Sequence, residues 1–388
     1  MSQAQPVSYT PGTTLPDEEF ESSLAEDKIA VATQWQLMWW RFRKHKLAQA
    51  AAFIIIFFYL GVIFADFLAY TSPSATEAYR SLIAPQPVYL FDRSGRFSPF
   101  VYKMIGTRDP ITLQRVYVPD KNQRVYLRFF AKGFPYKIMG LIPTTIHLIG
   151  VADAAPEESL FLLGTDQLGR DVWSRLMLGS RTSLSIGLVG VSLSLILGVF
   201  LGGISGFYGG WIDDVIQRVI EILRSIPAIP LWMGLAAALP TSWSILQIYL
   251  AITVILSLIG WTGLARVVRG KFLSLREEEF ISAAELAGCS QFRIIFRHML
   301  PSFTSHIIAA MTLALPSMII SETALSFLGL GLRAPAVSWG VLLQDAQNIQ
   351  TIANSTWLLV PAVPIIIAIL AFNFLGDGLR DAADPYGG

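Results

Sequence analysis

Charged residues and cysteines are scarce in this 388-residue sequence. Only 15% of the residues are charged, against 53% hydrophobic residues, and the charges cluster so that long stretches are nearly free of them. The formal net charge of +1 lacks the basic excess that is typical of nucleic-acid binding. The single cysteine, Cys289, excludes an internal disulfide framework and any cysteine-based zinc site.

Several functional motifs are also missing. The sequence has no G-x-x-x-x-G-K-[ST] phosphate loop, so we expect no ATP hydrolysis by this chain. None of the four histidines lies in an H-E-x-x-H motif, and there is no G-x-S-x-G elbow. We therefore predict no catalytic residue and no bound metal or cofactor, and an intramembrane enzyme is only a remote alternative.

Apolar runs of about 20 residues, the length that crosses a bilayer core of ~30 Å, recur along the chain. A soluble protein with very hydrophobic core helices is disfavoured, because several separate runs have this length. We predict an all-α polytopic membrane protein with a small β-containing external domain between its first two helices. The six predicted transmembrane helices lie at residues 47–70, 183–208, 215–239, 246–266, 304–327 and 356–374.

Basic residues near the ends of these helices set the predicted orientation. Residues 41–46 are strongly basic and follow a cluster of aromatic residues, and residues 267–303 also carry many arginines. The positive-inside rule places both segments in the cytoplasm, and an even number of spans then puts both termini there. Residues 1–46 are expected to form a cytoplasmic tail and interfacial segment, without the apolar region of a cleavable signal peptide.

The long polar segment at residues 71–182 is predicted to lie outside, because loops beyond ~60 residues translocate largely regardless of their charge. Its stretches PVYLFDRSGRFSPFVY (87–102) and LQRVYVPDKNQRVYLRFF (113–130) carry β-branched and aromatic residues on both sides of a turn-rich centre. Each therefore predicts a β-hairpin. A structural lid or spacer and a docking role both remain open for this domain.

The third predicted span carries an unusual number of charges. Asp214 with Arg218, and Glu221 with Arg224, have the four- and three-residue spacings of ion pairs on a helix surface. Ionisable groups within spans usually face a bundle interior or a watery path, so Glu221 and Arg224 are candidate pathway residues, with packing as the alternative. Two prolines further along are expected to disrupt this helix.

A second candidate gate residue is Glu322, about 18 residues into the fifth predicted span. At ~1.5 Å per residue it lies ~27 Å from the cytoplasmic end, near the outer boundary. Gating or bracing is favoured there over direct contact with a substrate ammonium, and pairing with a basic group of the external domain is a further alternative.

Residues 280–301 form two short amphipathic helices in this prediction. Phe280, Ala283, Ala284 and Ala287 share one helix face, and Gly288 ends that helix. Ser290 then caps a second helix with an apolar stripe of its own. That stripe is Phe292, Ile295, Phe296 and Met299. Such a hairpin either packs against its own bundle or docks into a groove of a cytoplasmic partner.

The stretch SAAELAGCSQFRIIFRHMLP, residues 282–301, resembles the EAA loop of ABC importer permeases, which couples the permease to its ATPase. Ser282 stands where this family usually has Glu, and Glu285 lies one turn along as a possible substitute. The coupling residues that the resemblance implies are Ser282, Ala283, Ala284, Glu285, Gly288, Leu300 and Pro301.

Five further stretches resemble the C-type permease of dipeptide, oligopeptide and nickel importers. They are LGTDQLGRDVWSRLMLGSRTSL (163–184), GFYGGWIDDVIQR (206–218), SETALSFLGLGL (321–332), SWGVLLQDA (338–346) and LAFNFLGDGLRDAADP (370–385). The first contains an external motif at Gly164, Thr165, Asp166, Gly169, Arg170 and Asp171. We expect Asp166 to cap a helix there and Asp171 to pair with Arg175, which favours bracing over contact with a binding protein.

The resemblance implies the type I ABC importer fold and a place in the bacterial inner membrane. The chain would pair with a second homologous permease subunit and with two ATP-binding cassette subunits, separate or fused, which bind ATP and Mg²⁺. An external solute-binding protein would deliver peptides, or alternatively nickel chelates, opines or oligosaccharide-like solutes. Residues 183–388 would form the permease core, with the cytoplasmic coupling loop at 267–303.

Overall fold

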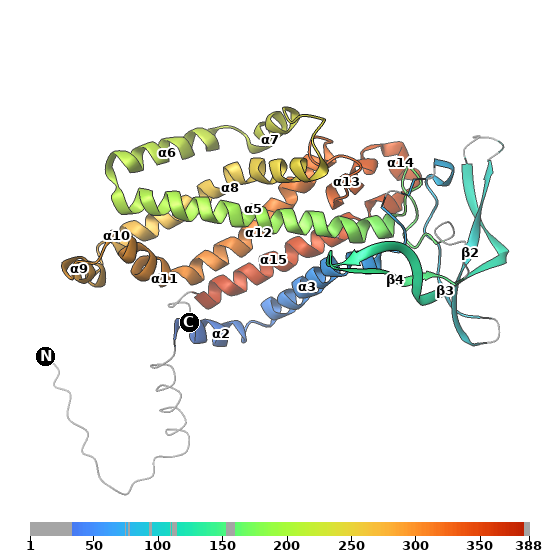
Figure 1. Ribbon diagram of the computed structural model, residues 1–388, viewed down its shortest axis with the longest axis horizontal. Helices are drawn as coiled ribbons and strands as arrows, with labels where there is room; N and C mark the ends of the chain where they lie inside the picture. The colour runs from blue at the N-terminus through green and yellow to red at the C-terminus, as the bar shows by residue number, and fades with distance from the viewer. Residues whose placement is uncertain are drawn as a thin grey trace, which may run out of the picture.

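The computed structural model describes residues 33–73, 75–76, 78–92, 95–108, 110, 115–152 and 160–383. The first 32 residues of the predicted tail therefore lie outside the described residues. The remainder forms an elongated helical bundle with a β-sheet at one end, and the short helices around residue 288 lie at the other end (Figure 1).

Five long apolar helices build the bundle. They are α3 (Lys46–Ile63), α5 (Val172–Tyr208), α8 (Ile245–Leu275), α12 (Thr304–Phe327) and the last span, in which η4 (Thr356–Leu359) leads into α15 (Ala362–Ala383). By length and composition, the described helices give five membrane spans, or six if one bent helix pair counts as a span. The bounds of α12 match the prediction for residues 304–327.

The second span begins earlier than predicted, at Val172 instead of residue 183. Asp171 is its N-cap, because its carboxylate accepts a hydrogen bond from the backbone N–H of Ser174 at 2.7 Å. The residues at the start of α5 are therefore helical. The prediction missed them because the continuous apolar run of this span begins only near residue 183. The first span is followed after one residue by α4 (Ala65–Leu68).

The bent pair consists of α6 (Gly210–Ser225) and α7 (Ala228–Ala237), whose axes differ by 86°. Ile226 and Pro227 separate them in extended conformations. Proline has no N–H to donate and restricts the residue before it to extended backbone, which explains the break. The predicted disruption of the third span is thus confirmed.

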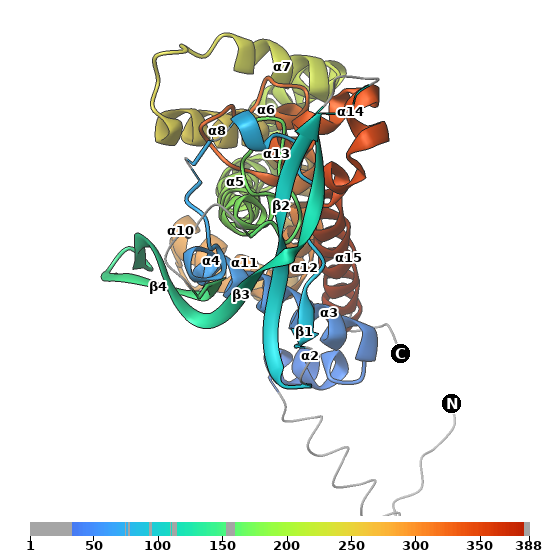
Figure 2. The same ribbon diagram turned by 90° about the vertical axis from the view of Figure 1, so that its right-hand side faces the viewer.

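The sheet is antiparallel with strand order β1-β2-β3-β4. Its strands are β1 (Tyr89–Phe91), β2 (Phe97–Arg108), β3 (Arg115–Ile138) and β4 (Ile142–Val151). Figure 2 looks at this end of the bundle and shows the β3–β4 hairpin projecting sideways past α4. The predicted hairpin at residues 87–102 is confirmed, because β1 pairs with β2.

The second predicted hairpin, at residues 113–130, is wrong. The chain does not reverse at residues 119–122, because both halves of this stretch belong to β3 and pair with β2. The register steps from Tyr102 opposite Arg124 to Lys103 opposite Asp120, so the extra residues of β3 form a bulge. A bulge absorbs turn-type residues without ending a strand, and the strand period alone cannot distinguish the two cases.

Shorter helices complete the chain. At one end of the bundle lie α2 (Gln34–Phe42), α9 (Glu279–Leu286), α10 (Gln291–Arg293), the π-helical turn η2 (Ile294–Met299) and α11 (Leu300–Ser302) (Figure 1). The other short helices are η1 (Ala78–Arg80), α13 (Trp339–Gln344), η3 (Asp345–Gln347) and α14 (Ile349–Asn354). Of these, α13 and α14 lie towards the sheet (Figure 1).

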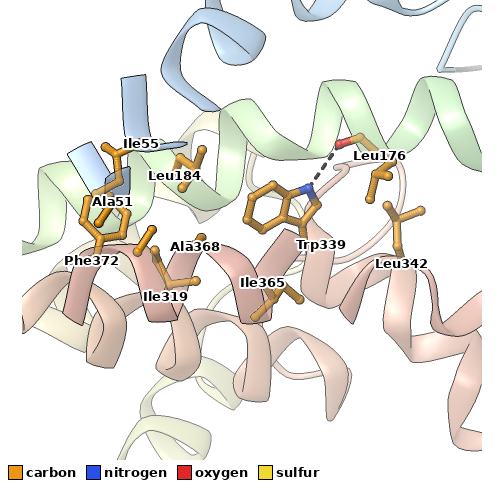
Figure 3. Close-up of a cluster of buried hydrophobic side chains, with 11 residues drawn as sticks. Ala51, Ile55, Leu176, Leu184, Ile319, Trp339, Leu342, Ile365, Ala368 and Phe372 are labelled. Carbon is orange, nitrogen blue, oxygen red and sulfur yellow. Dashed lines mark hydrogen bonds between the residues drawn. The ribbon is translucent and has the colours of Figure 1, made fainter. Parts of the chain in front are cut away.

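One buried cluster joins four spans around Trp339 of α13 (Figure 3). The indole N–H donates to the carbonyl of Leu176 in α5 at 3.1 Å, which satisfies the only polar atom of this side chain. Phe372 of α15, Ile319 of α12 and Ile55 of α3 belong to the same cluster. This core fixes α3, α12 and α15 against the N-terminal half of α5.

The contact between α5 and α8 depends instead on small residues. Gly198, Gly202 and Gly206 follow one another at four-residue intervals on α5. A Cβ at Gly202 would overlap the Ala265 carbonyl of α8, and one at Gly206 would lie 2.7 Å from the Arg269 carbonyl. The two backbones therefore approach as closely as in membrane helix pairs with small-xxx-small spacing.

Candidate functional site

The segment at residues 279–302 forms the helix, turn and second helix that the sequence predicts. Gly288 ends α9 with a φ of +75°, a conformation that favours glycine. The N–H groups of Gly288 and Cys289 donate to the carbonyls of Glu285 and Ala284 at 2.9 and 3.1 Å. The Ser290 hydroxyl then caps the next helix by accepting from the Arg293 N–H at 3.4 Å.

Most of the predicted apolar face of α9 is exposed, because only Ala284 of its four residues is buried. Ile281 and Ala284 are buried, whereas Phe280 is 44% exposed and Leu286 is 90% exposed. The Ile281 side chain, which is not part of the predicted face, fills the core instead. Ala283 and Ala287 are exposed together with Ser282, Glu285 and Gly288.

The second helix differs from its prediction for a related reason. Its middle is a π-helical turn, η2, so Ile294 and Met299, five residues apart, both point into the core. Phe292 and Phe296 are instead 71% and 49% exposed, with their ring centroids 4.4 Å apart. The i, i+3, i+4, i+7 pattern assumed a regular α-helix, so the predicted stripe is split between the exposed Phe292 and Phe296 and the buried Met299.

The outer surface of this segment accordingly presents four large apolar side chains to solvent in the single chain. We call Phe280, Leu286, Phe292 and Phe296 the exposed apolar set. Polar and charged side chains, including Glu285, lie between them. An apolar set of this kind at the end of a membrane bundle has the composition of a protein-docking surface.

The inner surface of the same segment is tightly held by the bundle. Ile281, Ile294 and Met299 are almost fully buried and pack with Phe272 of α8 and Phe303, which precedes α12. The rings of Phe272 and Phe303 meet edge to face at 5.8 Å. Of the predicted coupling residues, Leu300 is partly buried and packs against this cluster, and Pro301 lies in α11. A displacement of α9 would therefore reach α8 and α12 directly.

A bidentate ion pair joins α6 to α8 nearby. Arg269 Nε and Nη2 donate to the two carboxylate oxygens of Asp213 at 2.6 and 2.5 Å. Ser205 of α5 also donates to Asp213, and Gln217 donates to the Ser205 hydroxyl at 3.1 Å. Three helices thus share one polar network, in the planar fork geometry that makes Arg–carboxylate pairs strong.

The predicted pair of Glu221 with Arg224 does not form. Glu221 accepts from Arg218 at 2.8 Å instead, three residues towards the N-terminus, and Arg218 therefore does not make the expected pair with Asp214. Glu221 and Arg224 are exposed in the single chain. Glu221 and Arg224 do not share the open side, because Arg224 reaches towards α8, with Nη1 4.0 Å from the position of a Cβ on Gly263. The helix α6 stands at the edge of the bundle in Figure 1.

Glu322 is fully buried within α12, and the bonds that hold it come from hydroxyl groups. Ser183 of α5 and Ser326 donate to its two oxygens at 3.2 and 2.9 Å. The same hydroxyls accept the backbone N–H groups of Trp339 and Leu332, at 3.1 Å each. Among the described residues no basic group contacts this carboxylate, so none of them forms the alternative ion pair with the external domain.

The stretch 164–171 forms a compact turn. Asp166 accepts the N–H groups of Leu168 and Arg170 at 2.9 Å each and pairs with the Arg170 side chain at 2.6 Å. Gly169 allows the turn with a φ of +73°. Asp166 therefore caps the turn, whereas Asp171 caps the helix, which corrects the predicted roles.

Asp171 also does not pair with Arg175. The Tyr70 hydroxyl donates to Asp171 at 2.7 Å, and Arg175 Nε lies 3.7 Å from Asp166. Burial raises the pKa of Asp171 to about 6, against the hydrogen bonds from Tyr70 and Ser174 that lower it. This carboxylate therefore joins the start of α5 to the segment that follows α4.

Backbone contacts complete this joint. The Thr165 hydroxyl accepts from the Ile83 N–H at 2.8 Å and donates to the Arg80 carbonyl at 2.6 Å. The Trp357 indole donates to the Thr165 carbonyl at 3.0 Å. A Cβ at Gly164 would lie 2.5 Å from the Ile83 carbonyl, so only glycine fits. The buried contacts of the motif indicate bracing of η1, α5 and η4.

Sequence reasoning missed two features of the site. The Asp213–Arg269 pair joins residues 56 positions apart and has no local signal. The four-residue glycine spacing on α5 does have one, and the small-xxx-small pattern would have identified this face. Both features hold α5, α6 and α8 together next to the segment that carries the exposed apolar set.

Comparison with known families gives two matches. The model for the binding-protein-dependent transport system inner membrane component matches residues 195–386, and the model for the N-terminal transmembrane domain of oligopeptide transport permease C matches residues 33–85. Residues 86–194 lie outside both matched ranges.

Individual relatives and a solved structure are also similar. The dipeptide transport system permease protein DppC of Bacillus subtilis is 40% identical over 57% of this chain and 68% of its own length. The oligopeptide transport system permease protein OppC of the same organism is 38% identical over 62% and 76%, respectively. A structure of the MetNI methionine ABC transporter in an inward-facing conformation has a TM-score of 0.44 at 20% identity, over 54% of this chain and 96% of that chain.

Proposed function

Since the chain belongs to the family of binding-protein-dependent transport system inner membrane components, we propose that it is a permease subunit that imports peptides. Relatives named as dipeptide and oligopeptide permeases support this substrate class. ATP and Mg²⁺ would bind to separate ATPase subunits, and a solute-binding protein would deliver the peptide from outside.

The observation that carries the proposal is the exposed apolar set on a segment whose other side is fully packed. Leu286 is 90% exposed, whereas Ile281, five residues earlier, is 0% exposed. A rigid element with one open apolar face suits transmission of force, because a docked partner would move the buried face and the attached spans together. We propose that the ATPase docks on this set and drives a rigid-body switch between inward-open and outward-open states.

The position of this set also supports the proposed orientation. The exposed apolar set lies at the opposite end of the bundle from the sheet. Helix α2 and the C-terminal end of α15 lie towards the same end of the bundle as this set (Figure 1). If the set faces the cytoplasm, the sheet faces outward and both termini are cytoplasmic. The basic residues of α2, α10 and η2 agree with the positive-inside rule.

The open side of α6 is the candidate surface for the second permease subunit and for the transport pathway. Trp211, Val215 and Ile222 are 74%, 52% and 63% exposed there. Glu221 and Arg224 are exposed elsewhere on α6, and Arg224 reaches towards α8. Contact of a charged side chain with lipid is energetically unfavourable, so such side chains usually face protein or water. Glu322, fully buried among hydroxyls, would brace the outer half of the pathway without touching the peptide.

The test uses the complete transporter with Leu286→Glu, and Ile349→Glu as its matched control. Ile349 is 82% exposed, but it lies on α14 at the sheet end. Loss of a docked leucine should weaken the binding free energy of the complex by about 1.5–3 kcal/mol, which corresponds to a roughly 10- to 150-fold higher dissociation constant. Co-purification of the ATPase and ATP-dependent peptide uptake should both fall for Leu286→Glu and persist for the control.

Undiminished assembly and uptake with Leu286→Glu would refute docking at this set. The peptide assignment is tested separately by mass spectrometry of the ligand that the native solute-binding protein retains. Recovery of nickel chelates, opines or oligosaccharide-like compounds in place of peptides would change the substrate but leave the docking proposal intact.

A further inference from the structure

The tip of the β3–β4 hairpin exposes three large apolar side chains. Met139, Leu141 and Ile142 are 66%, 79% and 64% exposed. The Leu141 N–H donates to the Ile138 carbonyl at 3.0 Å across a turn in which Met139 and Gly140 have φ values of +51° and +75°. Two such positive values define a type I′ turn, in which Asn, Asp or Gly is the usual first residue.

Met139 is therefore an unusual choice of turn residue. A side chain other than Gly, Asn or Asp is disfavoured in the left-handed region, so the conformation alone gives no reason for methionine. Met139 instead adds to the exposed apolar surface that Leu141 and Ile142 form at the tip. This local choice points to a tip that is buried in an apolar environment.

Among the residues that the structure describes, none provides such an environment for the hairpin tip. Beyond the part of β3 that pairs with β2, the ribbon consists of β3 and β4 alone, with pairs up to Ile138 opposite Ile142. A two-stranded ribbon is only marginally stable in water. The ribbon in Figure 2 projects sideways from the bundle, so its outer part is free for a surface outside the chain.

The base of this ribbon is fixed at the end of the first membrane span. His147 of β4 is buried, with Nδ1 3.0 Å from the carbonyl oxygen of Asp66 in α4. The rings of Phe67 in α4 and Phe130 in β3 lie 6.1 Å apart. Because α4 follows α3 after one residue, the ribbon leaves the bundle at the level where α3 ends.

The apolar surface of the ribbon continues that of the first span. On α3, Phe57 and Leu60 are 70% and 47% exposed, and Phe64 just after it is 43% exposed. This is the face that lipid covers when α3 spans a bilayer. The contact between Phe67 and Phe130 extends it onto the ribbon, whose strand β4 lies beside the end of α3 in Figure 1.

The charges of the ribbon favour lipid over a protein as the covering surface. Residues 128–150 contain Arg128, Lys132 and Lys137 and no Asp or Glu, and all three basic side chains are exposed. Basic residues beside aromatic and large apolar ones are typical of segments that lie at a membrane interface. The basic groups would face anionic headgroups while the tip reaches the acyl chains.

We infer that the β3–β4 hairpin is a membrane anchor whose tip inserts into the outer leaflet beside α3. It would hold the external sheet at a fixed height and angle above the permease. This inference rests on the proposed orientation of the chain, in which the sheet faces outward.

The experiment measures the depth of the tip in the assembled transporter. The full chain carries Cys289→Ser, and a single cysteine is introduced by Leu141→Cys for labelling with an environment-sensitive fluorophore. Thr107→Cys is the control, because Thr107 is exposed near the end of β2, which lies further from the bundle. Both proteins are reconstituted into vesicles of phosphatidylethanolamine and phosphatidylglycerol, with spin-labelled lipid or aqueous iodide as the quencher.

The label at position 141 should be quenched by the spin-labelled lipid, with an iodide quenching constant severalfold lower than that at position 107. Equal iodide quenching at both positions would overturn the anchor, because the tip would then lie in water. Protection of position 141 from both quenchers would also overturn it, because a protein would then cover the tip.

Peptide uptake is measured on the same vesicles and separates the two proposals. Loss of lipid contact with normal uptake would refute the anchor alone. Lipid contact without any ATP-dependent uptake by the unlabelled transporter would refute the proposed function and leave the anchor standing.

Discussion

Substitution of Gly202 by alanine tests whether close backbone contact holds α5 against α8. A Cβ at Gly202 would overlap the Ala265 carbonyl and lie 2.8 Å from Ala265 Cα. These are backbone atoms, so no rotamer change can relieve the overlap, and the helices must separate. Overpacking of this kind costs about 1–3 kcal/mol.

The adjacent Gly203 gives a matched control. A Cβ at that position would lie 3.5 Å from the Phe272 ring, an ordinary van der Waals contact. Replacement of glycine by alanine within a helix gains about 1 kcal/mol in helix propensity, and this gain applies equally to both variants. The difference in the free energy of unfolding between Gly202→Ala and Gly203→Ala should therefore be about 1–3 kcal/mol, with Gly202→Ala the less stable.

Denaturation of the two purified variants in detergent, by heat or by sodium dodecyl sulfate, measures this difference directly. Gly203→Ala should equal or exceed the wild type in stability. If both variants unfold at the same midpoint, the separation of α5 and α8 does not depend on this glycine, and the close-contact reasoning fails.

Two further predictions concern polar joints. Arg269→Ala should lower the free energy of unfolding by about 1–3 kcal/mol, because a mostly buried carboxylate loses its charged partner. Arg269→Lys keeps the charge beside Asp213 but loses the bidentate geometry, so its stability should lie between those of Arg269→Ala and the wild type. Equal unfolding midpoints for Arg269→Ala and the wild type would contradict this role. Burial, and then the nearby Asp166, raise the pKa of Asp345 from 3.8 to about 6, against Arg170. The folded state therefore holds this proton more tightly than the unfolded state, so the stabilisation is complete below about pH 4 and is lost as pH rises through 6. Asp345→Asn should remove this dependence from a pH series of unfolding midpoints and raise stability at pH 7, and an unchanged pH profile would show that Asp345 does not cause it.

Much of the membrane architecture could be read from local composition. Apolar runs predicted the spans, and the prolines after residue 226 predicted the break between α6 and α7, because these properties belong to each segment by itself. The same holds for the turn at Gly288 and the cap at Ser290, which require only neighbouring backbone groups. Roles of the predicted coupling residues in docking stay predictions.

The errors arose where a distant segment decided the outcome. Residues 119–122 have the composition of a turn, but the long partner strand β2 pairs with both sides of them. Phe292, Phe296 and Met299 fit one α-helical stripe, but the core under this helix accepts Ile294 and Met299 through a π-helical turn and leaves the two rings exposed. In both cases the local pattern permitted two structures, and packing selected one.

The sequence by itself determined a membrane protein with interrupted apolar helices and a helix–turn–helix of the EAA type, because hydropathy, proline breaks and caps act over a few residues. Only the tertiary structure decided which side of that segment is open, that Asp213 meets Arg269, and that Glu322 is enclosed by serines. These outcomes depend on contacts between residues far apart in the chain, because the burial and the hydrogen-bond partners of a side chain are determined by which helices and strands pack against it.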